Sequence, residues 1–311
     1  MKRLAIVITV VMLLSPSFPS AQSTTTSLFS FHSNPWLNLH HFIRVVARGV
    51  TANADLSPAE RMAWDTGVQF YKPYGQRDVL FDEGMVKIAA VLHQAEGKST
   101  LDGFDLDADL RRTLQQVMPV YQKYWWPEHD RTNREWIAAV QPLVDRHGAA
   151  IGQAIARAYN ASWPSTPVAV DVTNFAGQAG AFSTGNPPHV TVSSRDASYK
   201  GYAALEMVFH EGSHAWDQLL IDGLDNAAKA NNVMLPRQLW HFVLFYTAGE
   251  LTTRELNARG INAYVMYAVK GDVYSRGCGG CREKIETAWA PYLDGKRSLN
   301  EALTQLVLAF K

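Results

Sequence analysis

The β-prone segments of this chain are confined to one short region between two long helical stretches, and this order limits the possible folds. Residues 167–172 favour a strand, 177–184 are glycine-rich and suit a turn with a short strand, and 189–194 alternate as a strand does. Helical patterns fill most of residues 34–160 and resume from about Ser198. Because strands and helices are segregated, the sequence predicts an α+β fold that is predominantly α-helical.

Capping signals and apolar periodicity predict the individual helices. Asn34 before Pro35 is typical of a helix start. Ser57 and Glu60 have the spacing of a capping box. Further helical patterns cover residues 81–95, 106–124, 133–159, 199–220 and 236–257.

Charge and hydropathy exclude several classes of protein. Lysine and arginine number 29, as do aspartate and glutamate, so we expect no broad basic surface for nucleic acid or an anionic membrane. After the first twenty residues the chain has no apolar stretch of about 18 residues, and we therefore expect no integral membrane segment once the signal peptide is removed.

The beginning of the chain has the layout of a secretory signal peptide. Lys2 and Arg3 precede an uncharged run over residues 4–14 that is apolar except for Thr9, and small, turn-forming residues follow. We expect residues 1–21 to be removed and the mature protein to be secreted or periplasmic. The two cysteines, Cys278 and Cys281, would then form a small disulfide around a glycine turn. A redox dithiol is the alternative, because arginines flank the pair.

One motif carries specific chemistry: His210-Glu211-Gly212-Ser213-His214 has the pattern HExxH. On a helix the two histidines lie one turn apart and point the same way, so that both imidazoles can bind one Zn²⁺ ion. Glu211 is placed to hold a water molecule and take its proton. Apolar neighbours predict a buried helix, in which these polar groups would be costly without a metal.

The motif resembles that of the zincin metallopeptidases, and the chain fits their gluzincin branch better than the metzincin branch. Metzincins would place a histidine six residues after His214, where this chain has Leu220. Gluzincins take a glutamate from a later helix, and the resemblance implies that Glu250 is the third zinc ligand. Helix geometry favours Glu250 over Glu255, because Glu250 lies in line with an apolar stripe and Glu255 has Arg259 at i+4.

Two supporting roles have several candidates. Asp217, one turn after His214, or Glu206, one turn before His210, could orient an imidazole ring. For the donor that stabilises an oxyanion, Tyr246 is favoured because it lies close in helical phase to Glu250. The alternatives are His241, which we expect to be a core histidine, Tyr264 and Tyr267.

The sequence therefore predicts a zinc metallohydrolase, specifically a peptidase. His210, His214 and Glu250 would bind Zn²⁺, Glu211 would act as general base, and Tyr246 would assist. The partner would be a peptide or protein substrate, aligned by strand addition if 189–194 is a sheet edge. The alternative is a non-catalytic zinc- or peptide-binding protein, whose structural site would be closed by four protein ligands.

The expected organisation is a signal peptide, a short tether and a single metallopeptidase-like domain. In chain order these are residues 1–21, a Ser/Thr-rich tether at 22–33, and a domain at 34–311 with a helical N-terminal part (34–162) and a zinc-binding part (163–311).

Overall fold

The computed structural model describes residues 27–177 and 180–311, and within them it confirms a predominantly helical α+β fold. The strands are β1 Phe29–His32, β2 Val168–Thr173, β3 Ala181–Thr184 and β4 His189–Ser193. The helices are α1 Pro35–Ala47, α2 Pro58–Gln76, α3 Glu83–Gln94, α4 Ala108–Tyr124, α5 Trp126–Ala158, α6 Tyr202–Ser213, η1 His214–Trp216, α7 Asp217–Asn231, α8 Leu239–Ala258, α9 Tyr267–Lys270, α10 Val273–Gly277, α11 Cys281–Leu293 and α12 Leu299–Leu308.

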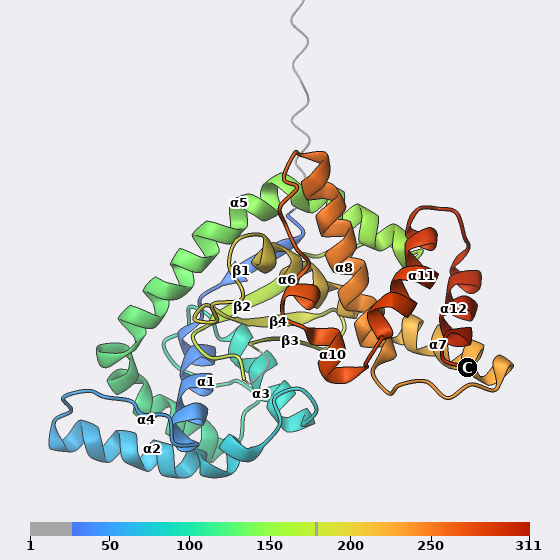
Figure 1. The fold of residues 1–311 in the computed structure, drawn as a ribbon. Helices are drawn as coiled ribbons and strands as arrows, with labels where there is room; N and C mark the ends of the chain where they lie inside the picture. Colours follow the sequence, from blue (N-terminus) through green and yellow to red (C-terminus); the bar gives the residue numbers. More distant parts are fainter. Residues whose placement is uncertain (1–26, 178–179) are drawn as a thin grey trace, which may run out of the picture.

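The sheet lies in the middle of the molecule, between two helical layers (Figure 1). Its strand order is β1-β2-β4-β3; β1, β2 and β4 are parallel and β3 is antiparallel to β4. The 189–194 segment therefore forms an interior strand, so the condition under which it could align a substrate by strand addition is not met. The edge on that side is β3, which pairs only with β4 among the described strands.

Each face of the sheet contacts a different helical layer because side chains alternate along a strand. One face carries paired valines, Val170 with Val190 and Val172 with Val192, and belongs to the larger hydrophobic core with α5, α6 and α8. The other face carries Asp171 and contacts the layer formed by α1–α4, which has a hydrophobic core of its own.

The N-terminal layer follows the capping signals in the sequence. The Asn34 side chain accepts hydrogen bonds from the first turn of α1, and Ser57 and Glu60 form the expected capping box at α2. The predicted tether at residues 22–33 is partly wrong. The described residues begin at residue 27, and residues 29–32 form strand β1. Parallel pairing with β2 satisfies their backbone groups, and the Ser/Thr-rich composition does not indicate this pairing.

The predicted helix over residues 199–220 is interrupted. It consists of α6, a 3₁₀ turn at His214–Trp216 and α7. Figure 1 shows α8 beside α6, with α7, α11 and α12 grouped at the C-terminal end of the molecule. Cys278 and Cys281 are joined by the expected disulfide just before α11.

The sequence also predicts a signal peptide and no integral membrane segment after it. The predicted signal peptide lies outside the described residues. Among residues 27–177 and 180–311, none of the helices is long and apolar enough to cross a membrane.

Candidate metal centre

The HExxH motif lies at the C-terminal end of α6, the helix that packs between the sheet and α8. His210 is in the last turn of α6 and His214 follows its last residue, and their ring centroids are 5.2 Å apart. His241, in the first turn of α8, completes a group of three imidazoles whose ligand atoms all lie within 4.8 Å of one another. The group therefore combines the two motif histidines with a third one from a separate helix.

The separations within this group suit a single tetrahedral ion. The Nε2 atoms of His210 and His241 are 3.2 Å apart. Two nitrogens bound to one zinc ion at about 2.0–2.1 Å in tetrahedral geometry would be about 3.3 Å apart. The ring of Phe245 stacks on that of His210 with a centroid distance of 3.7 Å, and so fixes the plane of this imidazole.

Burial keeps two of the three imidazoles neutral, which is the form that binds metals. Burial lowers the pKa of His210 well below its usual value, and the nearby His241 and His214 lower it further. Burial likewise lowers the pKa of His241 to about 3. Both rings therefore offer an unprotonated nitrogen at neutral pH.

Asp217 orients His214, as one of the two sequence alternatives predicts. The His214 Nδ1 atom lies 2.9 Å from Oδ2 of Asp217. Burial lowers the pKa of His214, but this hydrogen bond and the charge of Glu211 outweigh burial and raise it overall. Donation from Nδ1 to Asp217 leaves Nε2 free to face the other imidazoles.

Glu211 is buried beside the three histidines. Its Oε2 atom lies 3.7 Å from Nε2 of His214 and accepts a 2.6 Å hydrogen bond from the hydroxyl of Ser183 on β3. Burial raises the pKa of Glu211, although the charge of His214 and the Ser183 bond oppose this. A carboxylate with a raised pKa suits general acid–base catalysis near neutral pH.

The structure does not bring Glu250 to the three imidazoles, so the expectation that it is the third ligand is corrected. Its carboxylate pairs with Arg254 at 2.7 Å, and Arg254 also pairs with Asp294. Nine residues separate His241 from Glu250, which places them on opposite sides of α8. Because α8 is buried on both sides, its apolar stripe does not identify the side that faces α6.

Tyr246 also lies away from the imidazoles. Burial raises its pKa, and the next contributions come from Glu250 and Glu286, which places the phenol on the Glu250 side of α8. The expected catalytic role of Tyr246 therefore has no support from its position. The hydroxyl of Tyr264, an alternative oxyanion donor, donates instead to Glu206 at 2.6 Å, and Glu206 is hydrogen-bonded there and not to an imidazole.

Two other tyrosines lie on the side of the site where Glu211 and Phe245 are found. Tyr267 donates from its hydroxyl to that of Tyr199 at 3.3 Å, and its ring lies 6.3 Å from that of Phe245. Burial raises the pKa of Tyr199, and the charge of Glu211 is among the other causes. Tyr267, an alternative in the sequence, is thus better placed than Tyr246.

Sequence reasoning did not identify His241 as a candidate metal ligand, and it did not identify Ser183 as part of the site. A signal for His241 was present, because Phe245 and Gly249 follow it at intervals of four residues and mark one side of α8. Gly249 lies where an added Cβ atom would be 3.0 Å from Glu206, so this side of α8 approaches α6 closely. Ser183 gave no signal, because its role depends on strand pairing.

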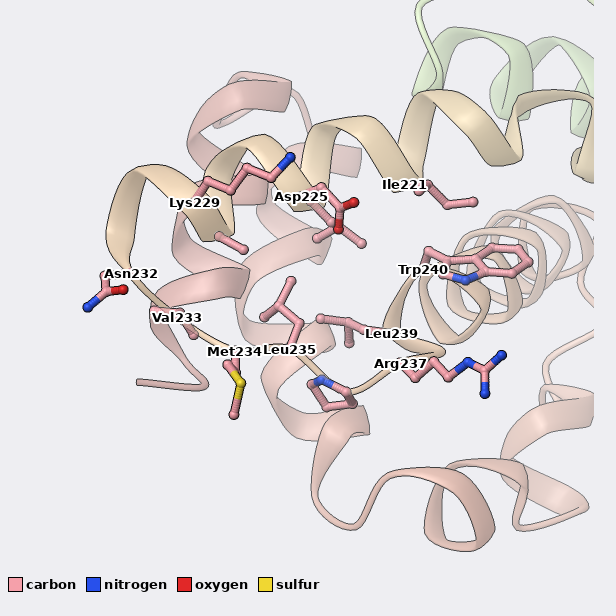
Figure 2. A pocket seen from close by; sticks show the side chains of 13 residues that line it. Ile221, Asp225, Lys229, Asn232, Val233, Met234, Leu235, Arg237, Leu239 and Trp240 are labelled. Carbon is pink, nitrogen blue, oxygen red and sulfur yellow. The ribbon is translucent and has the colours of Figure 1, made fainter.

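A pocket of about 540 Å³ adjoins the centre through Trp240. Figure 2 shows Ile221, Asp225 and Lys229 on α7 along one side of it, with the loop leading to α8 on the other. The ring of Trp240 lies 6.0 Å from that of His214 and stacks with that of His241. The pocket could therefore hold a group attached to a molecule bound at the histidines.

Comparison of the chain with protein-family models, curated proteins and solved structures finds no match.

Proposed function

We propose that this protein is a zinc-dependent peptidase whose metal ligands are His210, His214 and His241. The observation that carries the proposal is the convergence of three imidazoles beside the buried carboxylate of Glu211. Three protein ligands with a fourth position left for water or substrate are typical of catalytic zinc sites. The third ligand thus differs from the one that the gluzincin resemblance implies.

The chain's own residues have distinct tasks in this proposal. When bound, zinc supplies Lewis-acid chemistry and makes a water molecule more acidic. Glu211 accepts a proton from the attacking water and passes it to the leaving amine. Ser183 holds Oε2 of Glu211 in place, and Asp217 holds His214.

The surroundings of the centre suit an extended peptide. Strand β3 carries Ser183 next to Glu211 and is paired on one side only among the described strands, so a substrate strand can add to it. The pocket beside Trp240 offers space for one substrate side chain next to the reacting bond. Its lining combines apolar side chains with Asp225, Lys229 and Arg237.

We further propose that the protein acts outside the cytosol. The signal-peptide pattern at residues 1–21 and the Cys278–Cys281 disulfide both support an oxidising compartment.

The test is cleavage of a peptide mixture by the zinc-loaded protein, with new termini identified by mass spectrometry. Glu211→Gln should keep its zinc and lose activity by about 10²–10⁴-fold, because it cannot accept a proton. Glu255→Gln is the matched control, because this carboxylate on α8 pairs with Arg259 and His147 and is outside the group of three imidazoles. Equal activity of Glu211→Gln and the unmodified protein, or no cleavage by the zinc-loaded protein, would contradict the proposal.

A further inference from the structure

A second cluster of metal-binding side chains lies on the opposite face of the sheet. The Oδ2 atom of Asp171 on β2 lies 2.7 Å from Nδ1 of His93 on α3 and 2.5 Å from Nε2 of His189 on β4. These three ligand atoms all lie within 4.8 Å of one another. The cluster shares no residue with the candidate peptidase centre.

Strand register explains how two of these residues meet. His189 pairs with Ala169 in the parallel β2–β4 ladder, and Asp171 lies two residues beyond Ala169. Side chains two apart point to the same face of a strand, so Asp171 and His189 both face the N-terminal helical layer. His93 reaches the same point from the last turn of α3.

The cluster has features that a purely structural hydrogen-bonded triad does not need. Both imidazoles approach one oxygen of Asp171, while the other oxygen, Oδ1, has no hydrogen-bond partner among the described residues. The Asp171 side chain is fully buried. A buried carboxylate oxygen without a partner is costly unless a cation or another donor compensates it.

A fourth imidazole lies nearby. His41 on α1 is 1% exposed, and neither of its ring nitrogens has a partner within the described part of the chain. Burial and then the charge of Arg44 lower its pKa, and His41 also lies close enough to Asp171 and His189 for their charges to affect this pKa. The α1 helix therefore presents a second unsatisfied buried group at the edge of the same cluster.

We propose that His93, Asp171 and His189 bind a second divalent transition-metal ion, of which zinc is the one to test. Two imidazoles and one carboxylate form a donor set that suits zinc and its neighbours in the first transition row. Binding of the ion would break the two hydrogen bonds to Oδ2; each imidazole would present an unprotonated nitrogen to the ion, and its proton would move to the other ring nitrogen or to solvent. Ligand atoms around such an ion are about 3.2 Å apart, so each nitrogen needs to move by less than about 1 Å.

An ion can reach the cluster from solvent, and a bound ion would connect α3 to the sheet. The side chains of His93 and His189 are 25% and 14% exposed, so an ion can reach the carboxylate from solvent. A bound ion would connect α3 to two strands of the sheet. Since β4 pairs with β3, it would also stiffen the strand that carries Ser183.

The experiment counts zinc ions bound per chain by equilibrium dialysis and elemental analysis. We expect two for the unmodified protein, one for His93→Ala, one for Asp171→Asn and none for the double variant His93→Ala, His241→Ala. His32→Ala is the matched control, because its ring lies 5.0 Å from that of His93. This variant should still bind two zinc ions, because His32 is not one of the three clustered residues. If Asp171→Asn does not fold, the zinc content of His93→Ala still tests the second site, because His93 is partly exposed and its replacement disturbs the core less.

The two proposals fail in different ways. Unchanged zinc stoichiometry and affinity in His93→Ala would overturn the second site, whatever happens at the first. If instead the His241 centre binds no zinc, His241→Ala would equal the unmodified protein while His93→Ala would still lose one ion. A second readout is the melting temperature of His241→Ala, which zinc should raise only while His93 is present.

Discussion

The Nε2 atoms of His210 and His241 lie 3.2 Å apart although 31 residues separate them in the chain. This contact joins α6 to α8 at the end where the HExxH motif lies. The third imidazole of the candidate site therefore comes from the first turn of α8 and not from its middle. The ion pair of Glu250 with Arg254 lies on the other side of that helix.

His241→Ala should therefore weaken zinc binding at this centre by more than about 100-fold, since it removes one of three ligands. Glu250→Gln should leave the affinity unchanged. Competition with a coloured chelator measures both, with His93→Ala present in each protein so that only one centre is counted. An equal loss of zinc affinity in the two variants would indicate that Glu250 is also a zinc ligand.

Asp217→Ala should weaken zinc binding by about 10–100-fold without removing a ligand. The carboxylate fixes the proton on Nδ1 of His214, and its loss lets the imidazole rotate and change tautomer. The same chelator competition applies. Asp222→Ala, on the same helix and hydrogen-bonded only to Gln218 among the described residues, should have no effect.

Ser183→Ala should move the acidic limb of the activity profile to higher pH. The hydroxyl stabilises the ionised form of Glu211, so its removal raises the pKa of a carboxyl that burial already raises. A general base must be deprotonated to act, and the pH needed for half-maximal kcat/KM therefore increases. Thr184→Val on the same strand is the control, and a profile displaced equally in both variants would contradict the role of Ser183.

The overall fold was predictable because its signals are local. The caps at Asn34 and Ser57 and the alternation in 189–194 depend on residues close together in the chain, and each corresponds to an element of the structure. β1 was not predictable, because its four residues follow a Ser/Thr-rich stretch and become a strand only through pairing with β2. The exact edge of the sheet depends on such pairing too.

The candidate site was predictable only as far as one helix determines it. His210, Glu211 and His214 lie together because they share a helical segment, and Asp217 follows one turn later. The third ligand depends on how α8 is rotated against α6, and burial on both sides of α8 left that rotation undetermined. The cluster around Asp171 combines side chains from α3, β2 and β4, and their positions in the sequence do not indicate that these side chains meet.

Gly212→Ala should lower the free energy of unfolding by about 1–2 kcal/mol. Alanine favours a helix over glycine by about 0.5–1 kcal/mol, but an added Cβ atom would lie 3.0 Å from the ring of Trp163 and 3.2 Å from that of Phe29. Overpacking of this kind costs about 1–3 kcal/mol. Urea denaturation measures the effect. Gly279→Ala should be close to neutral, because among the described residues no atom beyond its two chain neighbours lies within 4 Å of the new Cβ.

Glu206 makes the stability of the protein depend on pH. Burial raises its pKa from 4.5 to about 7, despite hydrogen bonds from the Tyr264 hydroxyl and the Tyr267 amide. The folded state therefore binds this proton more tightly than the unfolded chain does. Its contribution to stability is greatest below about pH 4.5 and is lost as the pH rises to about 7, a difference of about 3 kcal/mol.

Glu206→Gln cannot ionise, so it should lack this loss. Relative to the unmodified protein, the variant should gain about 3 kcal/mol in free energy of unfolding between pH 4.5 and 7.5, measured by urea denaturation in the presence of a chelator. Tyr264→Phe removes a donor that stabilises the carboxylate, so the loss of stability should extend to higher pH in that variant. Parallel stability curves for Glu206→Gln and the unmodified protein would show that Glu206 ionises in the folded state as readily as in the unfolded chain.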